Sequence, residues 1–427
     1  MITDDHNNSC NESRSKTRKT ARERFFAVDA RSWPKVCDIG MPAAVSYLVL
    51  ACGSGGDQVT TRWSVDAITR HTGIGRPRAK QAVAALVNAG LIRVEKGGTR
   101  PQYSIVHVHQ QAEASLTSEE QRIYDIIAWG FNTVPKIGRN DDIWKYGKPY
   151  ETALSLARKG YLEDHGGSRF TLAESAAAPD LIWLPCSLVE VVNEDPSVTP
   201  VERIRQSNNI RALRLFIDLY HAHDLINGPG INWRPPHGLR YKFERVQLGQ
   251  YGEFVVWGFK PLHAESYSAA RFLEPHLDHT IEDVATKFWE AFKILTDLRL
   301  LAPVTYLVEN DSQHGEELWP IPMDGIGEEC EQAVGRAAAK LTSLMLTERQ
   351  ADRAKELKLR ALCPVPRHVA DVQAVGIYRL RHRPHTEATR AWFADLQDQC
   401  KGTIERFEII IAKIELAATA SPHATSR

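Results

Sequence analysis

The chain is organised around the stretch Thr72-Gly73-Ile74-Gly75-Arg76-Pro77 and the helix that begins there. Ser64 is a suitable N-cap for a short helix that runs to His71, and Gly73 allows the tight turn after it. A second helix is expected to begin near Arg76. Its apolar residues recur at spacings of three and four, so they share one face: Ala79, Ala82, Val83, Leu86 and Val87. The sequence therefore predicts two helices joined by a tight turn, the second of them basic at its N-terminal end.

A two-stranded hairpin is predicted directly after the second helix. Gly90 has the position of a C-terminal capping glycine, and residues 91–94 and 99–106 alternate as two strands around the polar residues 95–98. In this register Ile92 and Val94 pair in phase with Tyr103 and Ile105. The polar side chains left near the tip or on the outer face are Arg93, Lys96, Arg100 and Gln102.

Residues 41–109 resemble the winged-helix DNA-binding domains of bacterial regulators, the GntR-like kind especially. The resemblance is carried by three stretches: Thr72-Gly73-Ile74-Gly75-Arg76, Leu86-Val87-Asn88-Ala89-Gly90-Leu91-Ile92 and Lys96-Gly97-Gly98-Thr99. They cover about one sixth of the chain and are specific for the fold. The resemblance implies a helix-turn-helix and a wing that bind double-stranded DNA, with the apolar residues 41–52 as the first of three core helices.

The expected DNA contacts follow from the shape of the major groove. The groove admits one α-helix and presents guanine N7 and O6 as paired acceptors, which suit an arginine near the start of that helix. The residues expected on bases are Arg76, Arg78 and Gln81, and those expected on phosphates are Lys80 and Thr72. Lys96 and Arg100 supply charge at the wing, with Arg93 and Gln102 beside them.

Length and charge fit a DNA-binding protein. The 427 residues suffice for about three domains. The net charge of zero hides an asymmetry, since residues 1–107 hold 16 Lys and Arg against 9 Asp and Glu, whereas residues 108–350 hold 24 against 35. This asymmetry favours a polyanion-binding domain within residues 1–107 of a chain that is neutral overall. Residues 1–40 are expected to be a basic, partly disordered arm, which either lies along DNA or only solubilises the protein.

Other features argue against secretion, membrane insertion and catalysis. The seven cysteines are scattered and never spaced as Cys-x-x-Cys, which favours a reduced, cytoplasmic protein without a zinc site. Residues Met1 to Asn11 are polar and acidic rather than apolar, and there is no run of 18 apolar residues, so we expect neither a signal peptide nor a membrane partner. We find no nucleophile elbow, phosphate loop or dinucleotide motif, and we expect neither an enzyme nor a cofactor.

One histidine pair invites a different interpretation. His107 and His109 alternate on the outgoing wing strand, an arrangement that rolling-circle nucleases use to hold a metal. A nuclease would need this strand inside a larger sheet, whereas here it is the outer edge of the wing. Exposed histidines at the end of a strand are therefore the preferred interpretation.

The rest of the chain predicts further units of the same kind. Residues 116–174 repeat the order of helix, helix and hairpin, but few basic residues lie near the start of the second helix, so packing or dimerisation is favoured there over DNA reading. Residues 180–323 suggest a third, elaborated winged helix. Residues 324–427 are expected to be helical, and the apolar stripe of the last helix, residues 387–417, needs a partner surface that a homodimer would supply. The basic residues 378–385 are either a phosphate-contacting patch or a solvated loop.

Together these patterns predict a mainly α fold with small β-hairpins, built from tandem winged helices and a C-terminal helical region. The function favoured is that of a sequence-specific, double-stranded DNA-binding protein of bacterial type, most simply a transcriptional regulator. Two alternatives stay open: a replication initiator of a plasmid or other mobile element, since such initiators also carry winged helices in tandem, and an assembly protein that uses winged helices without binding DNA.

Overall fold

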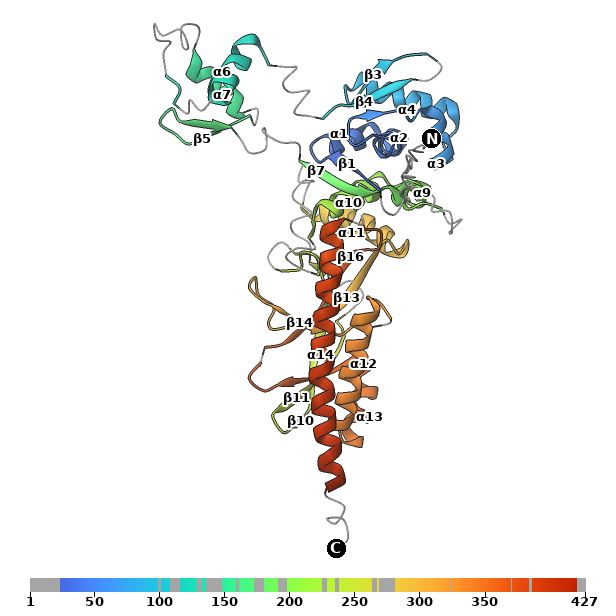
Figure 1. Ribbon diagram of the computed structural model, residues 1–427, viewed down its shortest axis with the longest axis vertical. Helices are drawn as coiled ribbons and strands as arrows, with labels where there is room; N and C mark the ends of the chain where they lie inside the picture. Colours follow the sequence, from blue (N-terminus) through green and yellow to red (C-terminus); the bar gives the residue numbers. More distant parts are fainter. Residues whose placement is uncertain are drawn as a thin grey trace, which may run out of the picture.

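The computed structural model describes residues 24–98, 101–107, 116–128, 133–135, 148–158, 161–172, 180–190, 198–224, 229–234, 238–262, 267–268, 281–323, 325–369, 371–383 and 386–420. Figure 1 shows a group of short helices and small sheets at one end of the molecule and an elongated body of strands and long helices at the other. The chain passes from the first part to the second near α10 (Ile210–His221) and α11 (Ile281–Asp297).

The helix-turn-helix and its hairpin form as the local sequence predicts. The elements are α2 (Met41–Cys52), β2 (Thr60–Thr61), α3 (Val65–Thr72), α4 (Arg76–Asn88), β3 (Ile92–Lys96) and β4 (Gln102–Ile105). Ser64 caps α3 by accepting a hydrogen bond from the Asp66 amide. Gly73 has a φ of 65°, which the turn requires and glycine adopts without strain. The strands pair Ile92 with Ile105 and Val94 with Tyr103, which confirms the predicted register.

The N-terminal residues are part of this core. Residues 25–39, which we expected in a basic arm, instead form β1 (Phe25–Asp29) and α1 (Ser32–Ile39), and Trp33 of α1 is fully buried. Strand β1 pairs antiparallel with β7 (Leu181–Pro185), which is followed by the 3₁₀ turn η1 (Cys186–Leu188) and by α9 (Pro200–Gln206). One continuous apolar core extends from Phe26 through α2 and α4 to α10 and α11.

A second unit lies between these segments in the sequence and has its own core. It contains α6 (Ser118–Ala128), α7 (Pro149–Arg158), β5 (Leu162–Asp164) and β6 (Phe170–Leu172), close to the predicted order of helix, helix and hairpin. Its core residues come from this unit alone, with Ile123, Leu156 and Phe170 fully buried.

A seven-stranded antiparallel sheet makes up the elongated body. The order along the sheet is β14-β13-β16-β10-β11-β15, and β12 (Tyr267–Ser268) also pairs with β10. These strands are β10 (Arg240–Tyr251), β11 (Phe254–Pro261), β13 (Leu301–Val308), β14 (Glu317–Pro320), β15 (Ala361–Pro366) and β16 (Gln373–Leu380). Two short strands, β8 (His223–Asp224) and β9 (Gly230–Ile231), pair separately. The prediction of a mainly α fold with small hairpins is therefore wrong, because all the described strands within residues 240–380 belong to one large sheet.

Three helices pack along this sheet. They are α12 (Glu329–Met345), α13 (Glu348–Glu356) and α14 (Glu387–Ala420), and Figure 1 shows α14 running beside α12 down the length of the body. The apolar stripe of α14 lies in a shared core with α12 and the sheet, where Leu396, Cys400, Phe407 and Ile411 are buried. Part of the stripe is thus covered within the chain, while Phe393 is 38% exposed, and the homodimer expected through this helix stays a prediction. Among the described residues, no helix combines the length and the hydropathy needed to cross a membrane.

Candidate nucleic-acid interface

Helix α4 presents a polar face to solvent and an apolar face to the core. Its buried residues (Ala79, Ala82, Val83 and Leu86) pack against α2 and α3. The four residues predicted to meet DNA on this helix are all exposed: Arg76, Arg78, Lys80 and Gln81. All four lie on the first two turns of α4, spread around the side that faces away from the core, and Pro77 fits the start of the helix.

Arg76 has one acidic neighbour. Its guanidinium forms an ion pair with Asp66 in the first turn of α3, and both side chains are 60% exposed. An ion pair as exposed as this contributes about 0–1 kcal/mol in water, because the two charges are well solvated and screened. A phosphate or a guanine can therefore compete with Asp66 for Arg76.

Thr72 does not belong to the exposed face. It is 1% exposed, its hydroxyl donates to the Ile68 carbonyl at 2.6 Å, and its oxygen accepts from the Ile74 amide at 3.2 Å. These two bonds hold the last turn of α3 and the first residue after the turn. The side chain expected on a phosphate is thus used to fix the helix-turn-helix itself, and we leave it out of the interface.

The wing carries part of the predicted charge. Arg93 and Lys96 on β3 are exposed, and Gln102 on β4 is half-buried and paired with Lys96 in the register. Glu95 accepts a hydrogen bond from Ser104 at 2.6 Å across the two strands. Arg100, the fourth wing residue predicted, lies outside the described residues.

Helix α9 adds a contact that local sequence patterns did not reveal. A side chain at Gly73 would meet the Glu202 carboxylate at 3.4 Å, so the start of α9 lies against the turn between α3 and α4. Glu202 is itself paired with Arg205 at 3.3 Å. The turn at Gly73 is therefore packed against α9, a helix more than a hundred residues away in sequence.

The second basic segment, residues 378–385, is not a solvated loop at its start. Residues 378–380 end the central strand β16, and Arg379 is buried, with hydrogen bonds to Glu331 at 2.7 and 2.8 Å and to the Tyr306 hydroxyl at 2.8 Å. Burial alone would raise the pKa of Glu331, but Arg379 and Tyr306 outweigh it and hold the pKa below its ordinary value. A patch that contacts phosphates through Arg379 is therefore excluded by its burial.

His107, expected to be exposed at the end of the wing strand, is buried. His107 is 4% exposed, and its Nδ1 lies 3.8 Å from Asp29 Oδ2. His109 lies outside the described residues. His107 therefore belongs to the packing between the wing strand and β1.

Comparison of the chain with models of known protein families, with curated proteins and with solved structures finds no match.

Proposed function

We propose that this protein binds double-stranded DNA sequence-specifically through α4 and the β3–β4 wing, and that it acts as a transcriptional regulator. The observation that carries the proposal is the exposed face of α4, with Arg76, Arg78, Lys80 and Gln81 on its first two turns. The opposite face of the helix is buried, so the orientation of this polar face is fixed by packing. A rigid helix with arginine and glutamine at its N-terminal end suits the floor of the major groove.

The electrostatics of this end of α4 support the same conclusion. The three cationic side chains lie close to the helix N-terminus, whose backbone N–H groups add partial positive charge. Arg93 and Lys96 extend the positive charge along the wing. In the proposed complex, these side chains would contact phosphates beside the groove that α4 occupies.

The proposal is tested by selecting bound sequences from randomised duplexes with the full-length protein and then measuring affinity for the selected site. Arg78→Ala is expected to weaken binding about five- to 150-fold, the equivalent of about 1–3 kcal/mol, and to relax the preference at one base position. Arg336→Ala is the control, since Arg336 is likewise an exposed arginine on a helix but lies on α12, away from α4. If both variants bind like the wild type, α4 is not the reading helix.

A replication initiator is the second candidate, because a second helix-helix-hairpin unit follows the first. The exposed hairpin residues of that unit include Glu163 and Asp164, so it is poorly suited to approach phosphates. The two functions differ in the sites that are bound in a genome-wide pull-down. Isolated operators near promoters support a regulator, whereas directly repeated sites beside an AT-rich segment support an initiator. An assembly protein would select no duplex at all.

A further inference from the structure

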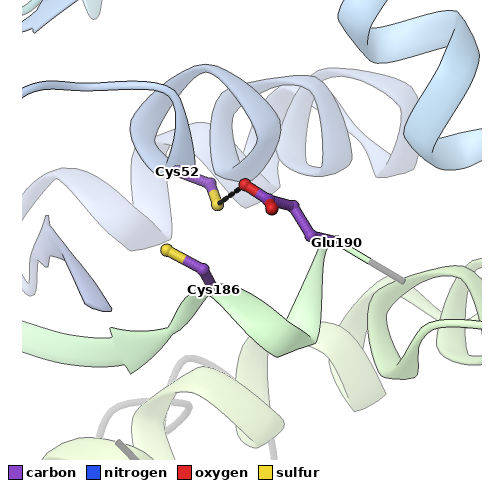
Figure 2. Close-up of side chains that lie close together, drawn as sticks. All are labelled: Cys52, Cys186 and Glu190. Atoms are coloured by element: carbon purple, nitrogen blue, oxygen red, sulfur yellow. Dashed lines mark hydrogen bonds between the residues drawn. The ribbon is translucent and has the colours of Figure 1, made fainter. Parts of the chain in front are cut away.

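Two cysteines and one glutamate meet where the helix-turn-helix joins the rest of the chain. Cys52 ends α2, Cys186 begins η1 and Glu190 follows one turn later. One donor atom from each residue lies within 4.8 Å of the other two, and Cys52 Sγ is 3.8 Å from Glu190 Oε1. Figure 2 shows the Cys52 sulfur beside the Glu190 carboxylate, with the Cys186 sulfur on the other side of Cys52 from Glu190. Both cysteines are buried, and the Glu190 side chain is 15% exposed.

This spacing is close to that of a tetrahedral zinc site. With Zn–S bonds of about 2.3 Å and Zn–O bonds of about 2.0 Å, a tetrahedral angle separates sulfur from oxygen by about 3.5 Å. The observed 3.8 Å between Cys52 and Glu190 would need to shorten by only a few tenths of an ångström. We propose that Cys52, Cys186 and Glu190 bind one zinc-like divalent cation, with water in the fourth position.

Arg24 positions the carboxylate for this role. Its guanidinium forms an ion pair with Glu190 Oε2, while Oε1 faces the sulfur of Cys52. The backbone also fixes the geometry, since the Cys186 amide donates to the Arg24 carbonyl at 2.9 Å and the Glu190 amide donates to the Cys186 carbonyl at 2.8 Å. Hydrogen-bonded partners of this kind commonly orient the ligands of a metal.

The charges of the site balance with or without the cation. With both thiols protonated, Arg24 and Glu190 cancel. Binding of a divalent cation releases two thiol protons to solvent, and the two thiolates then cancel the charge of the metal. An unbalanced charge is costly to bury. The exchange of two thiol protons for one divalent cation leaves the net charge unchanged, so it suits a site that is mostly closed to water.

The cation would join segments that are far apart in sequence. It would connect the end of α2, which packs on α4, to η1, and η1 in turn packs against α9. Because α9 lies against the turn of the helix-turn-helix, a metal here would hold the frame of α4 rather than touch its exposed face.

The experiment uses the full-length protein, stripped with a chelator under reducing conditions and titrated with Co²⁺. We expect one equivalent per chain, with the sulfur-to-cobalt absorption of a tetrahedral thiolate site, and its loss when Zn²⁺ displaces Co²⁺. Cys52→Ser and Cys186→Ser should abolish this absorption and Glu190→Gln should weaken binding at least tenfold. Cys330→Ser, in the other close cysteine pair, should leave it unchanged.

A second measurement covers the case in which these variants do not fold. In the wild-type chain, Zn²⁺ should protect Cys52 and Cys186 from alkylation, as mapped by peptide mass spectrometry, without protecting Cys330 and Cys400. The proposal is overturned if the reduced protein binds no Co²⁺, if the absorption persists in Cys52→Ser, or if protection is due to a Cys52–Cys186 disulfide that reductant removes.

Discussion

Replacing Glu331 by Gln tests what holds α12 to the sheet. The Glu331 and Arg379 side chains are 0% and 5% exposed. The carboxylate accepts two hydrogen bonds from Arg379, one from the Tyr306 hydroxyl and one from the Glu328 amide at 2.7 Å. An amide group in its place removes the negative charge and turns one acceptor into a donor that faces other donors.

The loss in free energy of unfolding can be worked out from this geometry. Breaking one partner of a buried ion pair costs about 3–5 kcal/mol, because the remaining charge stays buried without compensation. At 1.36 kcal/mol per factor of ten, amide hydrogens that exchange through opening of this region should exchange about 150- to 5,000-fold faster. Peptides from β13, β16 and α12 should show the change in hydrogen-exchange mass spectrometry.

Glu329→Gln is the control, because Glu329 lies in the same first turn of α12 but its pair with Arg336 is exposed. Its effect should stay within about 1 kcal/mol, which is less than tenfold in exchange. The reasoning is refuted if Glu331→Gln accelerates exchange no more than Glu329→Gln does.

Three further predictions concern the same structure. The stability that the Glu331 carboxylate supplies is fully present above pH 4.5, the ordinary pKa of a glutamate. It is lost as the pH falls through the pKa of Glu331 in the folded protein, which lies below 4.5. Acid unfolding followed by circular dichroism should therefore be less steep in Glu331→Gln than in the wild type. Gly73→Ala should destabilise the protein by about 1–2 kcal/mol, because Gly73 has a positive φ. Gly75 has a φ of −58° and no neighbour within 4 Å of an added Cβ, so Gly75→Ala should cost less than half as much free energy of unfolding. Equal effects of the two variants in a denaturant titration would contradict this explanation. Lys96→Ala should weaken binding to all duplexes alike and reduce the slope of log affinity against log salt by about one, and an unchanged slope would remove Lys96 from the interface.

The helix-turn-helix could be predicted because its signals are local. Ser64 caps α3, Gly73 makes the turn, and Ile92 and Val94 alternate with their partners across a short hairpin. Each of these signals lies within a few residues of the element it specifies. The exposed face of α4 followed from helical periodicity in the same way. Thr72, the last residue of α3, is the exception among the expected DNA contacts, because its hydroxyl binds the helix backbone.

The large sheet could not be predicted in this way, because its strands pair across long stretches of sequence. Pro364 and Pro366 resemble helix breakers, yet both lie on β15 at the end of the sheet order, where a strand tolerates proline. Arg379 belonged to a run of basic residues, and nothing near it in sequence showed that Glu331 would neutralise it. The spacing of Cys52, Cys186 and Glu190 likewise carries no motif, since the fold alone brings them together.

The claim that α4 enters the DNA is tested most directly by crosslinking. A photo-crosslinking amino acid at position 81 of the full-length protein should attach to a selected duplex on irradiation, because Gln81 is exposed on the proposed reading face. The same amino acid at position 339, an exposed site on α12, should not attach. Crosslinking at position 81 that disappears with excess unlabelled duplex agrees with the account. Duplex bound with no crosslink at position 81, or with equal crosslinking at position 339, contradicts it.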